Sequence, residues 1–426
     1  VLHDLGVKEL ELFSEPREGA VRLLYQGRAD EYARKIAALP ESLATERLAV
    51  VQKANDLRAQ GASAREIAVA ERLLRDLPRT PDEARVKWDR VRQDSLARTM
   101  HPPPHAEAHP GADRAARDKA RNNFIALVFV LMIGTAALPH ILTRYYTTPS
   151  VREARRSVFW SLLFIFLLYV TAPAYAVFAK WEVYSSLVGS NIETLPHWVA
   201  SWGRVGLVKI DDINGDGILQ LAELSINSDA ILLLVPELAG LPYVVSGLVA
   251  AGGLAAALST ADGLLLTISH ALSHDLYYKM INPEASTQRR LVITKSQLLV
   301  VAVVAAWVAS LRPDNILFMV GLAFSIAASA FFPALVLGIF WKRANKWGAV
   351  TGMIAGMGVT LFYIMRTHPF FGGSMGDAWL DIHPISSGVF GVSVGFVVIA
   401  VVSLLTPPPP PEVQALVDYV RMPDGR

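Results

Sequence analysis

The chain has 426 residues, of which 52% are hydrophobic and 18% are charged, and its formal net charge is only +2. A charge this small does not favour nucleic acid as a partner, and the absence of cysteine excludes disulfides, thiolate metal sites and cysteine nucleophiles. The averages combine two unlike parts, because residues 1–122 are rich in charge and the rest is mostly apolar. We therefore expect an all-α membrane protein preceded by a soluble helical region. The chain starts at Val1 without a signal peptide, which indicates the C-terminal portion of a longer protein.

Residues 1–100 are expected to form a soluble helical hairpin insert. Two helix starts are marked by Ser63 with Glu66 and by Thr80 with Glu83. Each pair fits a capping box, in which a hydroxyl and an acid three residues later bond to each other's backbone N–H groups. The candidate core of this region consists of Leu43, Leu48, Val50, Val51 and Leu57.

A linker rich in proline and histidine at 101–122 leads into a transmembrane region at 123–405, and 406–426 is a tail. About 20 apolar residues, at about 1.5 Å each, span the hydrocarbon core of a bilayer. By this rule seven spans are predicted, and Gly240 to Pro242 are expected to separate a helix outside the membrane from the third span. The predicted spans lie near 123–143, 157–178, 243–270, 291–311, 316–340, 347–366 and 386–405.

The loops after the first, third and fifth spans carry the densest positive charge for their length. By the positive-inside rule these loops are cytoplasmic, which predicts a multi-pass protein of the cytoplasmic (inner) membrane with a cytoplasmic C-terminus. A basic cluster before the first span disagrees, but the rule is weak beside a large translocated domain. The residues that set the orientation are Arg144, Arg152, Arg155, Arg156, Lys279, Arg289, Arg290, Lys342, Arg343 and Lys346.

The third span carries Ser259, Thr260 and Asp262 within an apolar helix. Polar groups in hydrocarbon are costly unless they face protein, water or an ion, so they are candidates for function. Two interpretations of the hydroxyls stay open at this point. They either belong to a small-residue packing seam and bond back to their own helix, or they help to replace water around a sodium ion.

The first span contains Gly134, Thr135, Pro139 and His140 in an otherwise apolar run. Proline removes a helical hydrogen bond and frees a carbonyl group. Broken helices at the middle of the membrane are where transporters hold ions and substrates. His140 is alternatively a packed residue near the cytoplasmic end of the span.

The outer loop between the second and third spans matches the calcium-binding loop of EF-hand proteins at each diagnostic position. Gly217 supplies the sharp turn at position 6, and the alternative is a turn rich in Asp and Asn that joins two surface helices. The predicted calcium ligands are Asp212, Asn214, Asp216, Ile218 through its carbonyl group, Gln220 and Glu223.

Three segments together resemble the sodium:solute symporter family and, within it, the bacterial branch of cation/acetate-like symporters: 134–159, 240–279 and 315–356. The resemblance implies the second half of a five-plus-five inverted-repeat (LeuT-like) transporter fold with two additional C-terminal helices. It places the sodium contacts of the family at Ala256, Ser259 and Thr260. It also places substrate contacts at the broken helix, at Gly134, Thr135, Pro139 and His140.

The function that this resemblance implies is sodium-coupled symport of a small organic solute, such as a short monocarboxylate like acetate, and not an enzymatic reaction. The family's first repeat has no counterpart here, so the N-terminal half of the same transporter is an expected partner, together with the solute and the lipid bilayer. A symporter-like sensory module that reports ligand occupancy is the alternative. An intramembrane hydrolase using Asp262 and His140 is disfavoured, because the sequence lacks paired acids in the spans.

Overall fold

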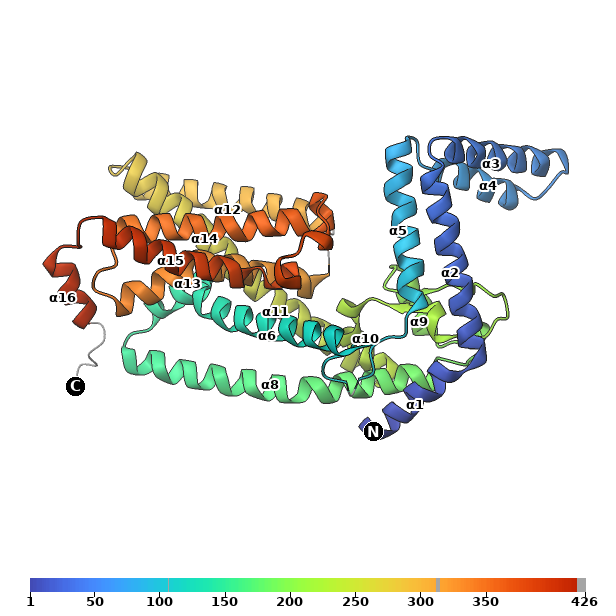
Figure 1. The fold of residues 1–426 in the computed structure, drawn as a ribbon, viewed down its shortest axis with the longest axis horizontal. Coiled ribbons are helices and arrows are strands. Elements are labelled where there is room, and N and C mark those ends of the chain that lie inside the picture. The colour runs from blue at the N-terminus through green and yellow to red at the C-terminus, as the bar shows by residue number, and fades with distance from the viewer. Residues whose placement is uncertain (106, 312–314, 420–426) are drawn as a thin grey trace. The chain divides into compact units, whose positions relative to one another are not determined.

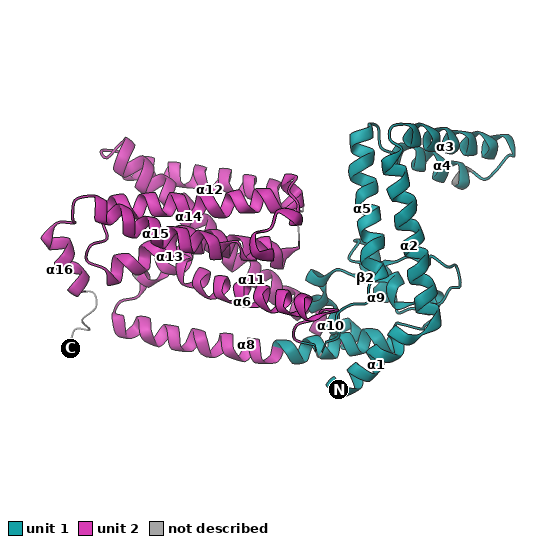
Figure 2. Cartoon of the chain, in the orientation of Figure 1, with its two compact units in different colours: residues 1–107, 172–241 teal, residues 108–171, 242–426 magenta. Residues whose placement is uncertain are grey.

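The computed structural model describes residues 1–105, 107–311 and 315–419. The chain forms two compact units, and each unit combines segments that are far apart in the sequence (Figure 2). Unit 1 contains residues 1–107 and 172–241, and unit 2 contains residues 108–171 and 242–426.

Unit 1 consists mostly of helices, coloured from blue to green in Figure 1. Two short antiparallel strands pair with Val208 opposite Ile226. The helices are α1 (Leu2–Ser14), α2 (Pro16–Ala37), α3 (Glu41–Ala59), α4 (Ala64–Asp76), α5 (Pro81–Thr99), the end of α8 (Val151–Ser186), α9 (His197–Arg204) and α10 (Ile231–Leu238); the strands are β1 (Val208–Ile210) and β2 (Leu224–Ile226); and the short 3₁₀ helices are η2 (Ile192–Thr194), η3 (Leu221–Glu223) and η4 (Ser228–Ala230).

The two predicted helix starts are present. At α4 the capping box is complete, since Glu66 N–H donates to Ser63 Oγ and Ser63 N–H donates to the Glu66 carboxylate. At α5 the Glu83 N–H donates to Thr80 Oγ1 at 3.2 Å, whereas the Glu83 carboxylate accepts the N–H of Arg79 instead of that of Thr80. The second capping box is therefore incomplete, because its glutamate bonds to the backbone one residue before the N-cap residue Thr80.

The core of the N-terminal helices differs from the predicted one. Leu43 is buried, but Leu48 is 64% exposed and Val51 is 38% exposed. Leu43 packs instead against Ala84 and Trp88 of α5. The prediction was wrong here because the α3 residues were grouped along their own helix, while the partner surface is formed by a helix about 40 residues later.

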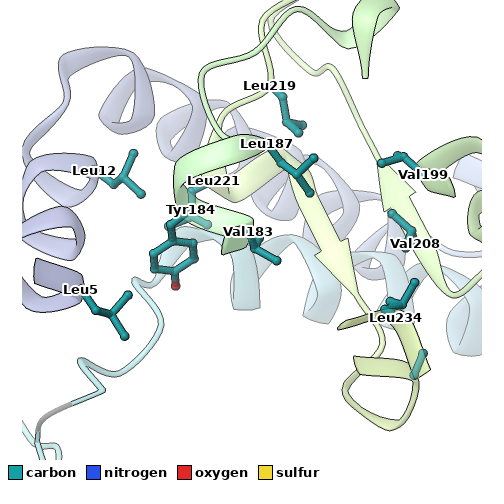
Figure 3. Close-up of a cluster of buried hydrophobic side chains, with 11 residues drawn as sticks. Leu5, Leu12, Val183, Tyr184, Leu187, Val199, Val208, Leu219, Leu221 and Leu234 are labelled. Carbon is teal, nitrogen blue, oxygen red and sulfur yellow. The ribbon is translucent and has the colours of Figure 1, made fainter. Parts of the chain in front are cut away.

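The main core of unit 1 joins both of its sequence segments (Figure 3). Leu5 and Leu12 of α1 belong to the same buried cluster as Val183 and Leu187 of α8. The other members are Tyr184, Val199, Val208, Leu219, Leu221, Ala230 and Leu234. The N-terminal helices and the segment at 172–241 thus share one hydrophobic core.

Buried charges also hold α2 against the outer loop. The Glu18 carboxylate, which is 2% exposed, pairs with Arg22 and accepts the N–H of Ala222 at 3.1 Å. The Tyr25 hydroxyl bonds to Asp211, and Arg28 pairs with the same carboxylate at 2.6 Å. Both ends of the predicted calcium loop are therefore bonded to α2.

Unit 2 contains helices at the places expected for the membrane spans. Among the described residues, seven helices are long and apolar enough to cross a bilayer, and all seven coincide with predicted spans. They are α6 (Arg114–Ala137), α8, α11 (Tyr243–His270) with its π-helical continuation η5 (Ala271–Ile281), α12 (Thr287–Ser310), α13 (Ile316–Phe340), α14 (Lys346–Thr367) and α15 (Gly388–Leu405). The shorter elements are α7 (Pro139–Leu142), η1 (Thr143–Thr147), η6 (Pro369–Phe371), η7 (Met375–Asp377), η8 (Trp379–Asp381), η9 (Pro384–Ser386) and α16 (Pro411–Tyr419).

The predicted break before the third span is confirmed. Helix α10 ends at Leu238, Gly240 adopts a positive φ of 66°, and α11 begins at Tyr243 directly after Pro242. A positive φ is readily reached only by glycine, and proline fits the residue before the first helical turn. The break separates α10 in unit 1 from α11 in unit 2.

Helices α13, α14 and α15 run side by side and pack closely (Figure 1). A Cβ atom added at Gly356 of α14 would lie 2.5 Å from the Ser329 carbonyl oxygen of α13 and 2.9 Å from that of Gly391 in α15. Buried Ser329 and Thr360 hydroxyls bond at 2.6 Å across the same contact. Small residues let helix backbones approach in a membrane, where apolar side chains gain little by leaving lipid.

Candidate sodium and substrate site

The first span is interrupted where the sequence predicted. Helix α6 ends at Ala137, Leu138 is extended at φ −68° and ψ 118°, and α7 starts at Pro139. Because Pro139 has no N–H, the Thr135 carbonyl group loses its usual helical donor. The interruption therefore exposes backbone polarity at a position that is otherwise apolar.

The four predicted substrate residues do not all lie in the same surroundings. Gly134 is buried, and a Cβ atom there would lie 2.8 Å from the carbonyl oxygen of Phe324 in α13. Thr135 is exposed, and its hydroxyl bonds back to the Leu131 carbonyl oxygen at 2.7 Å. In this structure Gly134 serves the close packing of α6 on α13, and Thr135 is satisfied by its own helix.

Pro139 and His140 are both half-buried in α7. The Nδ1 atom of His140 is buried and has no hydrogen-bond partner within the described residues. A buried polar atom without a partner is costly, so this nitrogen is available to a ligand or water that would complete it. His140 is thus the predicted substrate residue with unused hydrogen-bonding capacity.

The predicted sodium residues share one face of α11. Ala256, Ser259 and Thr260 are exposed in this structure, and the Thr260 hydroxyl lies 3.1 Å from the Ala256 carbonyl oxygen. This contact is a helical back-bond of the kind expected for a packing seam. Hydroxyl and carbonyl oxygen atoms are also the ligands that sodium prefers, so this contact leaves both interpretations of the hydroxyls open.

Helix α11 contacts α7 within unit 2. A Cβ atom at Gly263, one turn after Thr260, would lie 3.1 Å from the Arg144 guanidinium group in η1. From the sequence, Arg144 was predicted only as one of the positive charges of a cytoplasmic loop. Its position four residues after His140, about one helical turn, was the only sequence feature that connects it with the predicted substrate residues. The tertiary structure brings this positive charge against the candidate sodium helix.

Asp262 does not join this group of residues. Its side chain is exposed, and it forms no ion pair or hydrogen bond within the described residues. Within the described residues, the imidazole ring of His140 forms no hydrogen bond to a carboxylate or hydroxyl group either. This arrangement lacks the paired groups that a hydrolase needs.

The loop at 212–223 in unit 1 has some of the backbone turns that are expected of a calcium-binding loop. Gly215 and Gly217 adopt φ of 71° and 70°, and the Asp212 carboxylate accepts both of their N–H groups. The Asn214 and Asp216 side chains accept the N–H groups of residues two positions later, which are Asx turns. The Ile218 backbone also forms a bridge with Asn191.

Glu223 closes the loop from the other side. Its carboxylate is fully buried and accepts the N–H of Ile213 and of Gln220, both at 3.1 Å. Burial raises the pKa of Glu223, and the nearby charges of Asp212 and Asp216 raise it further. Within the described residues, no three His, Asp or Glu side chains are grouped as a metal site, so calcium binding stays a prediction.

Comparison with known proteins identifies a family for this chain. Residues 205–356 match the model of the Sodium:solute symporter family. Over 426 aligned positions, covering 99% of this chain, the sequence is also 51% identical to an uncharacterized symporter of Cupriavidus necator. The chain belongs to the sodium:solute symporter family.

The chain is also similar to the monocarboxylic acid transporter of Corynebacterium glutamicum. The two sequences are 28% identical over 294 residues, or 68% of this chain. The chain spans 62% of the Cupriavidus protein and 47% of the Corynebacterium protein. Membership makes this a multi-pass membrane protein of a transporter family, not of an enzyme family, in agreement with its seven candidate spans.

Proposed function

We propose that the protein takes part in sodium-coupled symport of a small monocarboxylate, of which acetate is the simplest. The observation that carries this proposal is the contact between α7, which follows the broken first span, and α11, which holds the paired oxygen atoms. Family membership supports sodium as the coupling ion. The name of the Corynebacterium relative supports a monocarboxylic acid as the solute.

In this proposal sodium is held by the Ser259 and Thr260 hydroxyls together with the Ala256 carbonyl oxygen. Sodium is a hard cation, so it is bound by oxygen atoms that replace its hydration shell. The Thr260 hydroxyl lies 3.1 Å from the Ala256 carbonyl oxygen, and in this proposal a bound sodium ion takes the place of that hydrogen bond.

The solute occupies the region of the α6–α7 break in this proposal. His140 Nδ1, in the tautomer that carries its proton there, can donate a hydrogen bond to the solute carboxylate. The guanidinium group of Arg144 supplies positive charge for a carboxylate, close to the sodium helix. Gly134 and Pro139 act on the backbone, the first by close packing and the second by breaking the helix.

The seven spans correspond to the second repeat of a five-plus-five transporter with two further helices. The exposed face of α11 would then be covered by residues that the longer relatives possess outside the matched region. Sodium bound between the two repeats stabilises one arrangement and favours capture of the solute, and the pair leaves after the repeats rock.

The test is uptake of radiolabelled acetate into proteoliposomes, with and without a sodium gradient. We expect uptake only with the gradient. Thr260→Val removes the hydroxyl but preserves the side-chain shape, and we expect it to raise the sodium concentration for half-maximal uptake by roughly tenfold or more.

Thr267→Val is the matched control. Thr267 lies on the same helix, and its hydroxyl makes the same kind of back-bond, to the Gly263 carbonyl oxygen at 2.8 Å. We expect Thr267→Val to leave sodium dependence unchanged. Equal effects of the two substitutions, or uptake that ignores sodium, would return Ser259 and Thr260 to helix packing.

Calcium binding at 212–223 is a second, structural activity that we propose for unit 1. It is supported by the two positive-φ glycines and by the position of the Glu223 carboxylate, which reaches across the loop from position 12 to position 2. The proposed ligands are Asp212, Asn214, Asp216, Ile218, Gln220 and Glu223. A divalent cation would offset the repulsion among the three carboxylates of this set.

A further inference from the structure

A second candidate binding site lies within unit 1. It is a cavity of about 590 Å³, within the size range of small-molecule sites. Its walls are formed by four segments of unit 1: the end of α5, the start of the linker, the C-terminal end of α8 and the segment from η3 to β2. The apolar part of the wall is formed mainly by Met100, Val183, Leu221, Leu224 and Ile226.

The charged side chains that line this cavity are all basic. Arg22 and Arg98 belong to the wall, His101 lies beside them, and no Asp or Glu lines it. Burial lowers the pKa of His101, and the positive charge of Arg22 lowers it further. One end of the cavity therefore holds two guanidinium groups, of which Arg22 pairs with Glu18 and Arg98 pairs with Asp94 at 3.3 Å, and the other end is apolar.

The two arginines are held in place by other contacts. Arg22 is 7% exposed and pairs with Glu18, and it donates to the carbonyl oxygens of Arg98 and Met100. One nitrogen of Arg98, Nη1, donates to the carbonyl oxygens of Ala222 and Glu223. Guanidinium groups that are already oriented lose little further freedom when an anion arrives.

Tyr184 provides an unused donor in the same wall. Its side chain is 5% exposed, and its hydroxyl makes no hydrogen bond within the described parts of the chain. In Figure 3 the hydroxyl end of Tyr184 points away from Leu187 and Leu219 of the hydrophobic cluster. Because it makes no such bond, the Tyr184 hydroxyl can donate to a ligand that enters the cavity.

We infer that this cavity binds a small organic anion with an apolar body, such as a monocarboxylate of a few carbons or an aromatic acid. The carboxylate accepts from the Tyr184 hydroxyl and the Arg98 guanidinium group, while the apolar body contacts Val183 and Leu224. The site is separate from the one proposed for transport. Its existence does not rest on the transport proposal, although both sites would select the same chemical class.

The test is equilibrium binding of radiolabelled benzoate and butyrate to the purified protein in nanodiscs without sodium, with benzamide as an uncharged competitor. Benzoate should bind saturably, and benzamide should compete at least about tenfold less well. Tyr184→Phe should weaken benzoate binding about fivefold to tenfold and leave the thermal stability of the protein unchanged or raised.

Tyr175→Phe is the matched control, because the Tyr175 hydroxyl lies on the same helix but donates to the Leu232 carbonyl oxygen at 2.9 Å. It should leave binding unchanged. Ala97→Trp, at an exposed position of α5 that lines the cavity, should block binding without removing a contact.

The outcomes separate the two proposals. Binding that Tyr184→Phe and Ala97→Trp both leave intact, or no saturable binding at all, overturns the cavity assignment, even if uptake of acetate is driven by sodium. Binding that both substitutions weaken supports the assignment, even in a preparation whose uptake ignores sodium.

Discussion

Glu223 shows how a single residue connects the outer loop to the stability of unit 1. Its carboxylate is buried, the charges of Asp212 and Asp216 raise its pKa, and a bound cation would offset that repulsion. We expect millimolar calcium to raise the thermal unfolding midpoint of the protein, since a ligand at about 100 times its Kd stabilises the folded state by about 2.7 kcal/mol.

In Glu223→Gln we expect this calcium-dependent shift to disappear, because the bidentate carboxylate at position 12 is lost. Glu193→Gln changes an exposed acid near the same loop and should keep the shift. Tryptophan fluorescence during heating reports the result, since Trp198 and Trp202 pack against the core of unit 1. A calcium shift that survives Glu223→Gln would contradict the proposed ligand set.

At the scale of elements, the packing of α14 can be tested by two glycines on the same helix. Gly356→Ala should destabilise unit 2 by about 1 to 3 kcal/mol, because the new Cβ atom would overlap the carbonyl oxygens of Ser329 and Gly391. Gly358→Ala meets nothing within 4 Å and should be neutral or stabilising, since alanine favours helix. Thermal aggregation of the detergent-solubilised variants measures the difference, and equal midpoints would show that α14 is not closely packed.

The elements also differ in how far the sequence determined them. The break at Leu138 and the start of α11 at Tyr243 were predicted because proline acts locally on the backbone. The partner of α3 was not, because contact between Leu43 and Trp88 depends on how separate helices dock. The glycine contacts of α14 have the same cause, since only the neighbouring backbone distinguishes Gly356 from Gly358.

At the scale of the whole molecule, unit 1 sets a condition on membrane topology. Its two segments, 1–107 and 172–241, share one core and must lie on the same side of the bilayer. Two spans, α6 and the first part of α8, lie between these segments in the sequence. The chain therefore crosses the bilayer once and crosses back before the second segment begins, which keeps both segments on one side. Helix α8 has 36 residues, or about 54 Å, which is enough to cross about 30 Å of hydrocarbon and still extend into unit 1.

Single cysteines in this cysteine-free chain can test that topology. We expect a membrane-impermeant thiol reagent applied outside intact cells to label Gln60→Cys and Lys209→Cys, but to label Glu284→Cys only after permeabilisation. The first two positions are exposed in unit 1, and the third is exposed in the loop after the third span. Labelling of Gln60→Cys and Glu284→Cys from the same side would contradict the orientation.

The sequence by itself determined the class of the protein, the seven spans, the broken first span and the small polar face of α11. These features depend on composition, run length and local backbone chemistry, which act within about 20 residues. Only the tertiary structure decided that 172–241 joins the N-terminal helices, that Arg144 lies against Gly263, and that Tyr184 lines the same cavity as Arg22 and Arg98. Each of these depends on surfaces from distant segments meeting, and neither periodicity nor motif spacing records which surfaces meet.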